Sequence, residues 1–328
     1  MANIAINGFG RIGRMVFRIM SMQAKHKIVA INDLTSPEML AHLLKYDSTH
    51  GKFEKQVKAG KSSLIVGRTE IPIFSEKDPE NLPWKKLKVD VVLECTGFFR
   101  TKESLEKHLK AGAKKVILSA PAKGDDIKTI VLGVNEQDID KKDKIISNAS
   151  CTTNSLAPFV KLIHEKYGFL KGLMTTVHAY TNDQNILDLP HSDFRRARAA
   201  AVNSVPTTTG AAIAVTEVIP DLKGKLDGIA IRVPVPDGSI TDLSFQLDKE
   251  VDVITLNNLV KKACSKELKG ILEYSEEPLV SSDIINNPNS GIFDSKLTKK
   301  VGDMYKVFIW YDNEYGYSNR MVDLIDLI

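Results

Sequence analysis

The chain is poor in cysteine, has no long apolar run and carries almost no net charge, and each of these features excludes a class of protein. Its three cysteines, Cys95, Cys151 and Cys264, are far apart and include no C-x-x-C pair. Neither a disulfide framework nor a metal site is therefore expected, and a reducing compartment fits best. No apolar run reaches the roughly 18 residues of a membrane span, and no signal-peptide pattern opens the chain. We expect a cytoplasmic protein without a membrane segment.

The charge balance is close to even, with 45 basic and 41 acidic residues and a net charge of +4 over 328 residues. An excess this small and this scattered does not indicate nucleic acid as the main partner, although it weakly favours anionic ligands such as phosphates. A chain of this length can form two domains with large apolar cores.

Two patterns divide the sequence near residue 150. Before it, short strand-like segments alternate with helix-like segments, which predicts an α/β, Rossmann-type doubly wound parallel sheet. The strands expected there are residues 2–7, 28–31, 89–95, 116–118 and 129–132. After it, longer amphipathic strands predict an α+β domain with a mostly antiparallel sheet. We expect domains over residues 1–150 and 151–314, with a helix at 315–328 packing back on the first.

A glycine-rich turn follows the first expected strand, where residues 8–13 match G-x-G-x-x-G. Gly8 allows the tight turn, Gly10 lets the backbone approach a pyrophosphate, and Gly13 lets helix and strand pack closely. The helix that follows supplies free N–H groups to the anion. Asp33 ends the second strand, where its carboxylate would meet the adenine ribose hydroxyls and repel the extra phosphate of NADP. The pattern predicts NAD binding, and a glycine turn without a ligand is the alternative.

Cys151 follows a strand and precedes a helix pattern that begins near Ser155, so we expect it at or near a helix N-terminus. The partial positive charge there lowers a thiol pKa and favours the thiolate, which is the nucleophilic form. His178 lies near the end of a later strand and is the candidate partner that a cysteine nucleophile needs. A buried cysteine on a polar loop and a structural histidine are the alternatives.

Three further segments are candidate anion sites. Arg232 lies within an otherwise apolar strand, where a buried guanidinium needs a partner. Residues 195–198 are rich in arginine, and residues 207–212 combine threonine with glycine. Residues 195–198 are equally compatible with a solvated helix face, and residues 207–212 with a helix cap.

Together these segments resemble the glyceraldehyde-3-phosphate dehydrogenase family over essentially the whole chain. The resemblance rests on residues 6–13, 149–154, 178–184, 209–212 and 310–314. It implies NAD-dependent oxidation of D-glyceraldehyde 3-phosphate to 1,3-bisphosphoglycerate, in glycolysis and gluconeogenesis. It also implies an NAD-binding first domain, a catalytic second domain, and a homotetramer in which residues 181–202 reach towards a neighbour's cofactor site.

By the same resemblance, Cys151 is the nucleophile that forms a hemithioacetal and then a thioester, and His178 is its acid–base partner. Inorganic phosphate attacks the thioester. The resemblance places the substrate phosphate on Thr181, Arg196 and Arg232. It places the attacking phosphate on Ser150, Thr152, Thr209 and Gly210. It places NAD on Gly8, Gly10, Arg11, Ile12, Gly13, Asp33, Lys77, Ser119 and Asn313.

The sequence departs from the usual family pattern at three places. Ser155 stands where many members have a second cysteine, which removes one route to an intramolecular disulfide. Lys77 stands where an arginine is common near the adenine end. Residues 236–239 read Pro-Asp-Gly-Ser in place of the more frequent Pro-Asn-Val-Ser, a difference to which the sequence alone assigns no function.

Other functions remain open on the same residues. An erythrose-4-phosphate dehydrogenase would keep the cysteine and histidine but handle phosphate differently. Semialdehyde dehydrogenases share the chemistry but resemble residues 209–212 and 310–314 less. A thiol redox sensor, or a nucleic-acid- or surface-binding protein, is a different class, but no aromatic–basic RNA motif or interaction tail is present.

Overall fold

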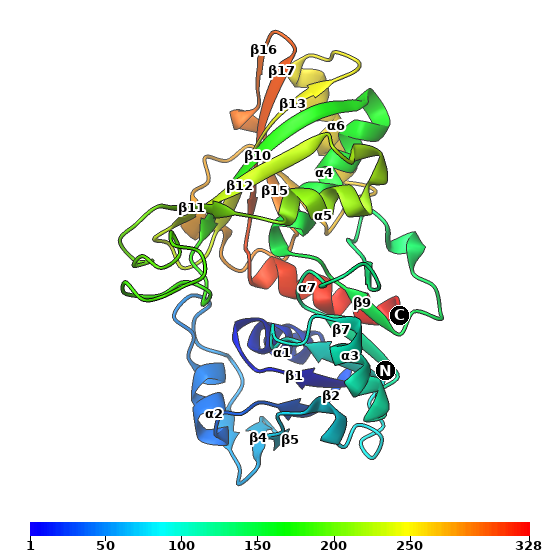
Figure 1. The fold of residues 1–328 in the computed structure, drawn as a ribbon, viewed down its shortest axis with the longest axis vertical. Coiled ribbons are helices and arrows are strands. Elements are labelled where there is room, and N and C mark those ends of the chain that lie inside the picture. Colours follow the sequence, from blue (N-terminus) through cyan, green and yellow to red (C-terminus); the bar gives the residue numbers. More distant parts are fainter. The chain divides into compact units, whose positions relative to one another are not determined.

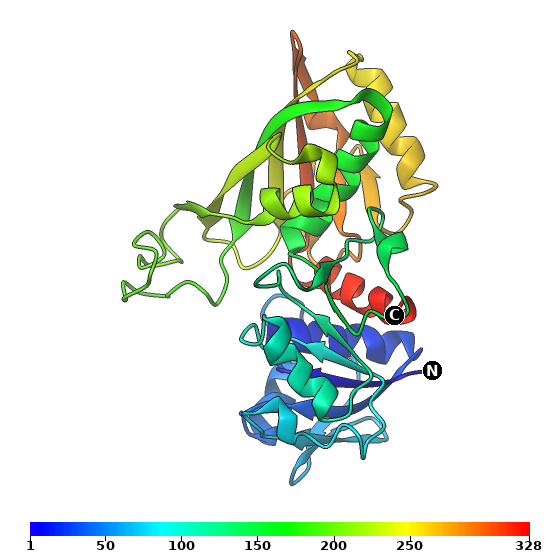
Figure 2. The ribbon, with the colours of Figure 1, turned by 45° about the vertical axis from the view of Figure 1, so that its right-hand side comes forward.

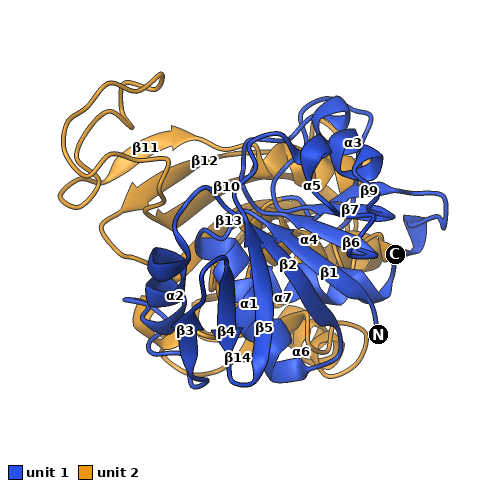
Figure 3. Cartoon of the chain, turned by 90° about the horizontal axis from the view of Figure 1, so that it is seen from below, with its two compact units in different colours: residues 1–130, 137–149, 318–328 blue, residues 131–136, 150–317 orange.

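The computed structural model describes residues 1–328 and divides into two compact units, coloured separately in Figure 3. Unit 1 comprises residues 1–130, 137–149 and 318–328, and unit 2 comprises residues 131–136 and 150–317. None of the helices combines the length and the apolar character that a membrane crossing requires.

Unit 1 is built on a nine-stranded sheet with the order β3-β4-β5-β2-β1-β6-β7-β9-β8. The strands are β1 (Asn3–Asn7), β2 (Lys27–Asn32), β3 (Val57–Ala59), β4 (Ser63–Val66), β5 (Thr69–Phe74), β6 (Val91–Glu94), β7 (Lys115–Leu118), β8 (Lys128–Thr129) and β9 (Ile145–Ser147). Every neighbouring pair from β5 to β8 is parallel, and only β3-β4 and β4-β5 are antiparallel. The predicted Rossmann-type parallel sheet is confirmed.

The helices of unit 1 begin where local signals place them (Figure 1). They are α1 (Arg11–Gln23), α2 (Pro37–Lys45) and α3 (Lys102–Lys110). Ser36 caps α2 by accepting a hydrogen bond from the Met39 N–H, and Pro37 occupies the first helical position. Thr101 and Ser104 form a reciprocal capping box at the start of α3.

Unit 2 contains an eight-stranded sheet with the order β11-β12-β10-β13-β17-β15-β14, in which β16 pairs with β17. Its strands are β10 (Phe169–Ala179), β11 (Val205–Thr208), β12 (Leu226–Val233), β13 (Ser239–Leu247), β14 (Leu272–Ser275), β15 (Gly291–Asp294), β16 (Lys299–Val301) and β17 (Met304–Tyr311). Only β10-β12 and β14-β15 are parallel, so the predicted mostly antiparallel sheet is confirmed.

One face of the unit 2 sheet is covered by helices, as Figure 2 shows. These helices are α4 (Cys151–Tyr167), α5 (Ala211–Val218) and α6 (Val253–Cys264), while α7 (Tyr315–Asp323) begins in unit 2 and continues into unit 1. Along β13, and along β17 after its exposed first residue Met304, buried residues alternate with half-buried ones, which is the pattern of a sheet packed on one side only. Leu243, Phe245 and Val307 therefore face the core beneath α4, and the opposite face stays open.

Short 3-10 segments complete the chain at Pro79–Asn81, Glu136–Asp138, Pro220–Leu222, Ser281–Ile284, Ser295–Leu297 and Leu324–Asp326. The end of one strand expected from the sequence was wrong. The strand expected at 129–132 ends at Thr129, because the chain turns at Val131, whose carbonyl accepts from the Val134 N–H. The basic segment 195–198 forms turns and no helix.

Candidate active site

Cys151 is the first residue of α4 and lies directly after the helix cap. Ser150 is the cap, and its hydroxyl accepts a hydrogen bond from the Thr153 N–H at 3.1 Å. The helix therefore begins four residues before the start that the sequence suggested. Serine, threonine and asparagine favour caps and turns over helix interiors, and here burial of residues 152–155 overrides that preference.

His178 and Arg232 are brought beside Cys151 by the pairing of two strands. The parallel register of β10 with β12 sets His178 opposite Arg232 at the ends of both strands. The Nε2 atom of His178 lies 3.5 Å from Cys151 Sγ. Its Nδ1 atom lies 2.6 Å from Nη1 of Arg232 and 2.7 Å from the carbonyl oxygen of Ala179.

Two groups of opposite character approach Nδ1 of His178. The Arg232 guanidinium can only donate a hydrogen bond, and the Ala179 carbonyl can only accept one. With its proton on Nδ1, bonded to the Ala179 carbonyl, the ring turns the lone pair of Nε2 towards Cys151 Sγ. Burial, together with the charge of Arg232, lowers the pKa of His178 to about 3. The resting imidazole is therefore neutral, and in this tautomer Nε2 can accept the proton of the thiol.

The thiol of Cys151 differs from the sequence-based expectation. Burial raises its pKa, while Arg232 and hydrogen bonds from Thr152 act in the opposite direction. Desolvation therefore outweighs the charge of Arg232 and the hydrogen bonds from Thr152 in this structure. Arg232 is the charged group that favours ionisation of the sulfur.

Tyr311 links the cysteine segment to the histidine strand, a role that the sequence reasoning missed. Its hydroxyl lies 2.8 Å from the Thr152 hydroxyl and 2.7 Å from the Thr176 hydroxyl. Its ring meets that of His178 edge to face, with centroids 5.9 Å apart. Two sequence signals could have found the pair: Tyr311 lies on the inward face of its strand, and Thr176 shares a strand face with His178.

Asn313 is held in one orientation by two residues at and just before the start of β13. Ser239 donates to its side-chain oxygen at 2.6 Å, and its backbone N–H donates to Asp237 at 3.2 Å. The Ser239 hydroxyl in turn accepts from the Ala179 N–H, directly after His178. Burial and the carboxylates of Asp312 and Glu314 raise the pKa of Asp237 to about 8.

The predicted anion residues fall into two groups in unit 2. Arg196 bonds Asp183, Thr207 and the Thr208 carbonyl, and its charge acts on Arg232 and His178. Arg232 is largely buried, and its Nε atom has no hydrogen-bond partner. An unpaired buried donor of this kind is expected where a ligand supplies the acceptor. Thr181 is half-buried and follows β10 by two residues.

The second group lies where the starts of α4 and α5 meet. The Thr153 hydroxyl donates to the Ala211 carbonyl at 3.5 Å and so joins the two helix N-termini. Ser150 caps α4 and Gly210 precedes α5 without any side-chain cap. The remaining predicted members of this group are Thr152 and Thr209. Two converging helix N-termini form an environment that favours an anion.

In unit 1 the glycine turn opens on a cavity of about 380 Å³. Four of the predicted residues line it: Gly8, Gly10, Asp33 and Lys77. The residues that sequence reasoning missed are Asn7, Asn32, Leu34, Glu76, Cys95, Thr96, Phe98 and Phe99. They end or follow β1, β2, β5 and β6, so the carboxyl ends of parallel strands form the site.

The other predicted cofactor residues do not line this cavity. Arg11 makes two hydrogen bonds with Asp47, at 2.6 and 3.1 Å, and Gly13 packs against Gly8. Ile12 is half-buried in the first turn of α1, and Ser119 contacts the Cys95 thiol. Asn313 belongs to unit 2.

A Rossmann-type unit with a strand–glycine turn–helix motif, joined to a unit with a cysteine–histidine pair, is typical of nucleotide-dependent dehydrogenases. Comparison with known proteins specifies the family. The model of the glyceraldehyde 3-phosphate dehydrogenase NAD binding domain matches residues 2–102, and that of the C-terminal domain matches residues 150–313. The chain belongs to the glyceraldehyde 3-phosphate dehydrogenase family.

Individual relatives agree over nearly full length. The chain is 59% identical to glyceraldehyde-3-phosphate dehydrogenase of Thermotoga maritima, covering 100% of this chain and 99% of the relative. It is 58% identical to the protein of that name from Priestia megaterium, over 99% of this chain and 97% of the relative. It is 57% identical to that of Geobacillus stearothermophilus, covering 98% and 96%. The predicted family, enzyme class and NAD cofactor are confirmed.

Proposed function

We propose that this protein oxidises and phosphorylates D-glyceraldehyde 3-phosphate to 1,3-bisphosphoglycerate with NAD, as a glycolytic enzyme. The observation that carries the proposal is the placement of Cys151 Sγ at a helix N-terminus, 3.5 Å from His178 Nε2, in a chain of this family. The relatives' names support the substrate, and the two anion groups in unit 2 suit the two phosphates of the reaction.

Side chains of unit 2 can carry out each chemical step of the proposed reaction. The Cys151 thiol passes its proton to Nε2 of His178 as the sulfur adds to the aldehyde carbon, and the protonated ring returns that proton to the oxyanion that forms, which gives the hemithioacetal. Loss of hydride from that carbon, with the hydroxyl proton passing to His178, gives a thioester. An oxygen of inorganic phosphate then attacks the carbonyl carbon, and the thiolate leaves as the acyl phosphate forms. Arg232 favours the thiolate as nucleophile and as leaving group.

Unit 1 fits a dinucleotide by its own geometry. Gly8 has a φ of +88°, and a Cβ there would lie 2.7 Å from the Thr96 nitrogen, so the turn is open only to glycine. No side chain caps the start of α1 at Gly10, where a Cβ would point into open space. Asp33 is fixed by the Phe9 N–H at 2.7 Å. When bound, NAD supplies the hydride acceptor.

The deciding experiment measures NADH formation from glyceraldehyde 3-phosphate with and without inorganic phosphate, in the wild type and in Cys151→Ser. We expect phosphate-dependent turnover in the wild type. The serine variant should lose turnover by more than about 10⁴-fold, because an alkoxide forms far less readily than a thiolate. NAD binding, measured by calorimetry, should be unchanged. Faster turnover of erythrose 4-phosphate, without a phosphate requirement, would contradict the substrate assignment.

We further propose that the enzyme is a homotetramer, while a cytoplasmic location stays a prediction. Leu173 and Ile229 are 68% and 50% exposed on the open face of the unit 2 sheet. Residues 181–202 expose Ile186, Leu187 and Phe194 as well. Apolar surface of this kind favours burial against another subunit. Light scattering should give four times the chain mass of 36.3 kDa, and a monomer would refute the proposal.

A further inference from the structure

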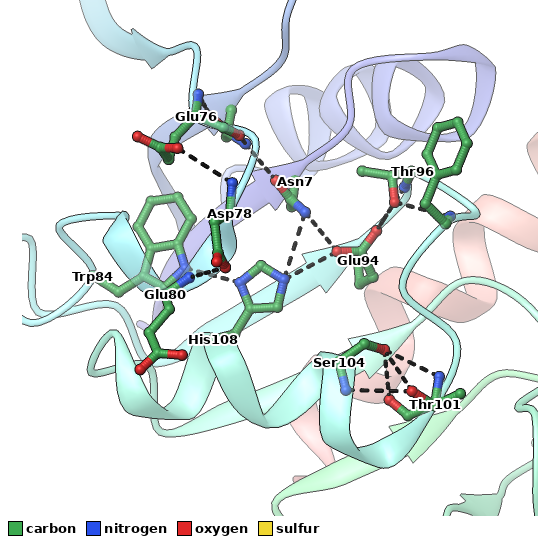
Figure 4. Close-up of polar contacts among 12 residues, drawn as sticks. Asn7, Glu76, Asp78, Glu80, Trp84, Glu94, Thr96, Thr101, Ser104 and His108 are labelled. Carbon is green, nitrogen blue, oxygen red and sulfur yellow. Dashed lines mark hydrogen bonds and ion pairs between the residues drawn. The ribbon is translucent and has the colours of Figure 1, made fainter.

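A buried polar network lies behind the cavity of unit 1 (Figure 4). Its centre is Glu94, at the end of β6, which is fully buried together with His108 of α3. Four donors converge on the Glu94 carboxylate. They are Asn7 Nδ2 at 2.5 Å, His108 Nε2 at 3.0 Å, the Thr96 N–H at 2.8 Å and the Thr96 hydroxyl at 2.5 Å.

Trp84 determines which form of His108 is present. Its indole N–H can only donate, and it lies 3.0 Å from His108 Nδ1. Nδ1 must therefore be an acceptor, so the ring is neutral and carries its proton on Nε2, pointing at Glu94. The contact between His108 and Glu94 is a directional hydrogen bond between a neutral ring and a carboxylate, and it forms no ion pair.

The hydrogen bonds to Glu94 also determine how the side-chain amides on the neighbouring strands are oriented. Asn7 must turn its amide nitrogen towards the carboxylate, which leaves its oxygen to accept from Asn32 Nδ2 at 2.7 Å. Asn32 then bonds both backbone groups of Glu76, accepting from the N–H and donating to the carbonyl, each at 2.9 Å. Reversing any one amide would set donor against donor or acceptor against acceptor.

The four residues ordered in this way are all part of the cavity wall. Asn7, Asn32, Glu76 and Thr96 line it, next to Gly8, Asp33 and Lys77. Glu94 and His108 do not line it themselves. They act from the core, at the point where β1, β2, β5 and β6 end.

We propose that Glu94 and His108 are positioning residues for the dinucleotide, acting through Asn7, Asn32 and Thr96 to hold the four strand-end loops in the binding geometry. The proposal rests on NAD binding in unit 1. It predicts an effect on cofactor affinity that is separate from the chemistry on Cys151.

The test compares NAD binding and steady-state kinetics in full-length variants. Glu94→Gln keeps the size of the side chain but sets an amide N–H among donors that need an acceptor. We expect the Kd and KM for NAD to rise about tenfold, because buried donors lose their acceptor. The kcat at saturating NAD should stay within about twofold of the wild type, since Glu94 does not touch the reacting atoms. A variant that binds NAD like the wild type would overturn the proposal.

A control separates positioning from loss of stability. Leu105→Ala removes a fully buried side chain from α3, the helix that carries His108. Leu105 belongs to the same apolar cluster as Trp84, and its replacement leaves the polar network unchanged. It should lower Tm but leave the KM for NAD unchanged. If it weakens NAD binding as much as Glu94→Gln does, at a similar loss of Tm, the role of Glu94 is only structural.

A pair of variants at His108 decides the matter even if Glu94→Gln does not fold. His108→Gln can place an N–H near the position of Nε2, whereas His108→Leu retains bulk and loses the donor. We expect His108→Gln to bind NAD within about threefold of the wild type, and His108→Leu to bind about tenfold more weakly. Equal affinity in the two variants would refute the proposal.

Discussion

At the scale of single residues, Arg232 acts on both members of the cysteine–histidine pair. Its charge lowers the pKa of His178 on one side and favours ionisation of Cys151 on the other. Neither effect requires a resting histidine that is charged. A neutral imidazole with a free Nε2 can accept the thiol proton and, once protonated, return it to the oxyanion in the proposed reaction.

Removing the charge of Arg232 should therefore make the cysteine harder to ionise. In Arg232→Gln, the pH profile of Cys151 alkylation by iodoacetamide should move to higher pH, because the group that lowers the thiol pKa is lost while burial remains. Arg196→Gln is the matched control, since Arg196 acts on His178 and Arg232 but is not among the causes found at Cys151. An alkylation profile with the same pH dependence in Arg232→Gln as in the wild type would contradict the role of Arg232 in ionising Cys151.

His178→Asn should slow hydride transfer by about 10²–10⁴-fold, the usual contribution of a general acid–base group. The measurement is single-turnover formation of NADH with saturating glyceraldehyde 3-phosphate. NAD affinity serves as the control, because His178 belongs to unit 2 and the NAD cavity to unit 1. A wild-type rate in this variant would leave the proposed mechanism without its proton acceptor.

The residues that the sequence predicted and those it missed differ in the kind of signal they carry. Cys151, His178 and Arg232 stand out because a thiol, an imidazole or a guanidinium in an apolar or glycine-rich setting is unusual. Tyr311 and Ser239 act only through neighbours 60 or more residues away, so no local pattern marks them. Glu94 resembles them in its contact with Asn7, 87 residues away, which forms only when the parallel strands assemble.

At the scale of elements, the turn from β1 to α1 contains three glycines that are needed for different reasons. Gly8 adopts a positive φ against the backbone of Cys95 and Thr96, and a Cβ on Gly13 would lie 2.1 Å from the Gly8 carbonyl oxygen. Gly10 has an ordinary φ of −71° and nothing within 4 Å of its Cβ position. The fold therefore requires two of the three glycines, and only the proposed contact with the dinucleotide accounts for the third, Gly10.

This division predicts different outcomes for two equally small changes. Gly8→Ala should lower the free energy of unfolding by at least about 2 kcal/mol, since strain at positive φ adds to a backbone clash. Gly10→Ala should cost less than about 1 kcal/mol, yet weaken NAD binding by about tenfold or more, because its Cβ meets the incoming pyrophosphate. Chemical denaturation and calorimetry measure the two quantities. Similar losses of stability in both variants would contradict the assignment.

The elements also show where local patterns stop being informative. Ser36 and Pro37 mark the start of α2 correctly, because a cap and a fixed φ act within one turn. The start of α4 was misplaced, because its first turn is polar and becomes helical only when buried. The register that sets His178 opposite Arg232 joins strands separated by a long crossover, and it depends on tertiary packing.

At the scale of the whole molecule, the change of pattern near residue 150 predicted both fold classes. Alternating strands and helices indicate a parallel sheet, and strictly alternating burial indicates a sheet packed on one face. The order of the strands did not follow from either pattern. It depends on long-range pairings such as β1 with β6, which are separated by more than 80 residues.

Asp237 makes the stability of the molecule sensitive to pH. Burial and the carboxylates of Asp312 and Glu314 raise its pKa to about 8, from 3.8 in an unfolded chain. The folded state therefore binds more protons, and the stability that this group contributes is fully present below pH 4 and is lost as the pH rises to about 8. A protonated aspartic acid donates from one oxygen and accepts at the other, and an asparagine likewise donates from its nitrogen and accepts at its oxygen.

Asp237→Asn should keep these hydrogen bonds at every pH and remove the titration. We expect its Tm to exceed that of the wild type by at least about 3 °C at pH 8.5, with the difference shrinking towards pH 5. Asp188→Asn is the control, because the pKa of that exposed carboxyl is lowered by the Ala199 N–H and by Arg198, so its removal brings no gain as the pH rises. A constant Tm difference between Asp237→Asn and the wild type from pH 5 to 8.5 would show that Asp237 is already ionised in the folded protein.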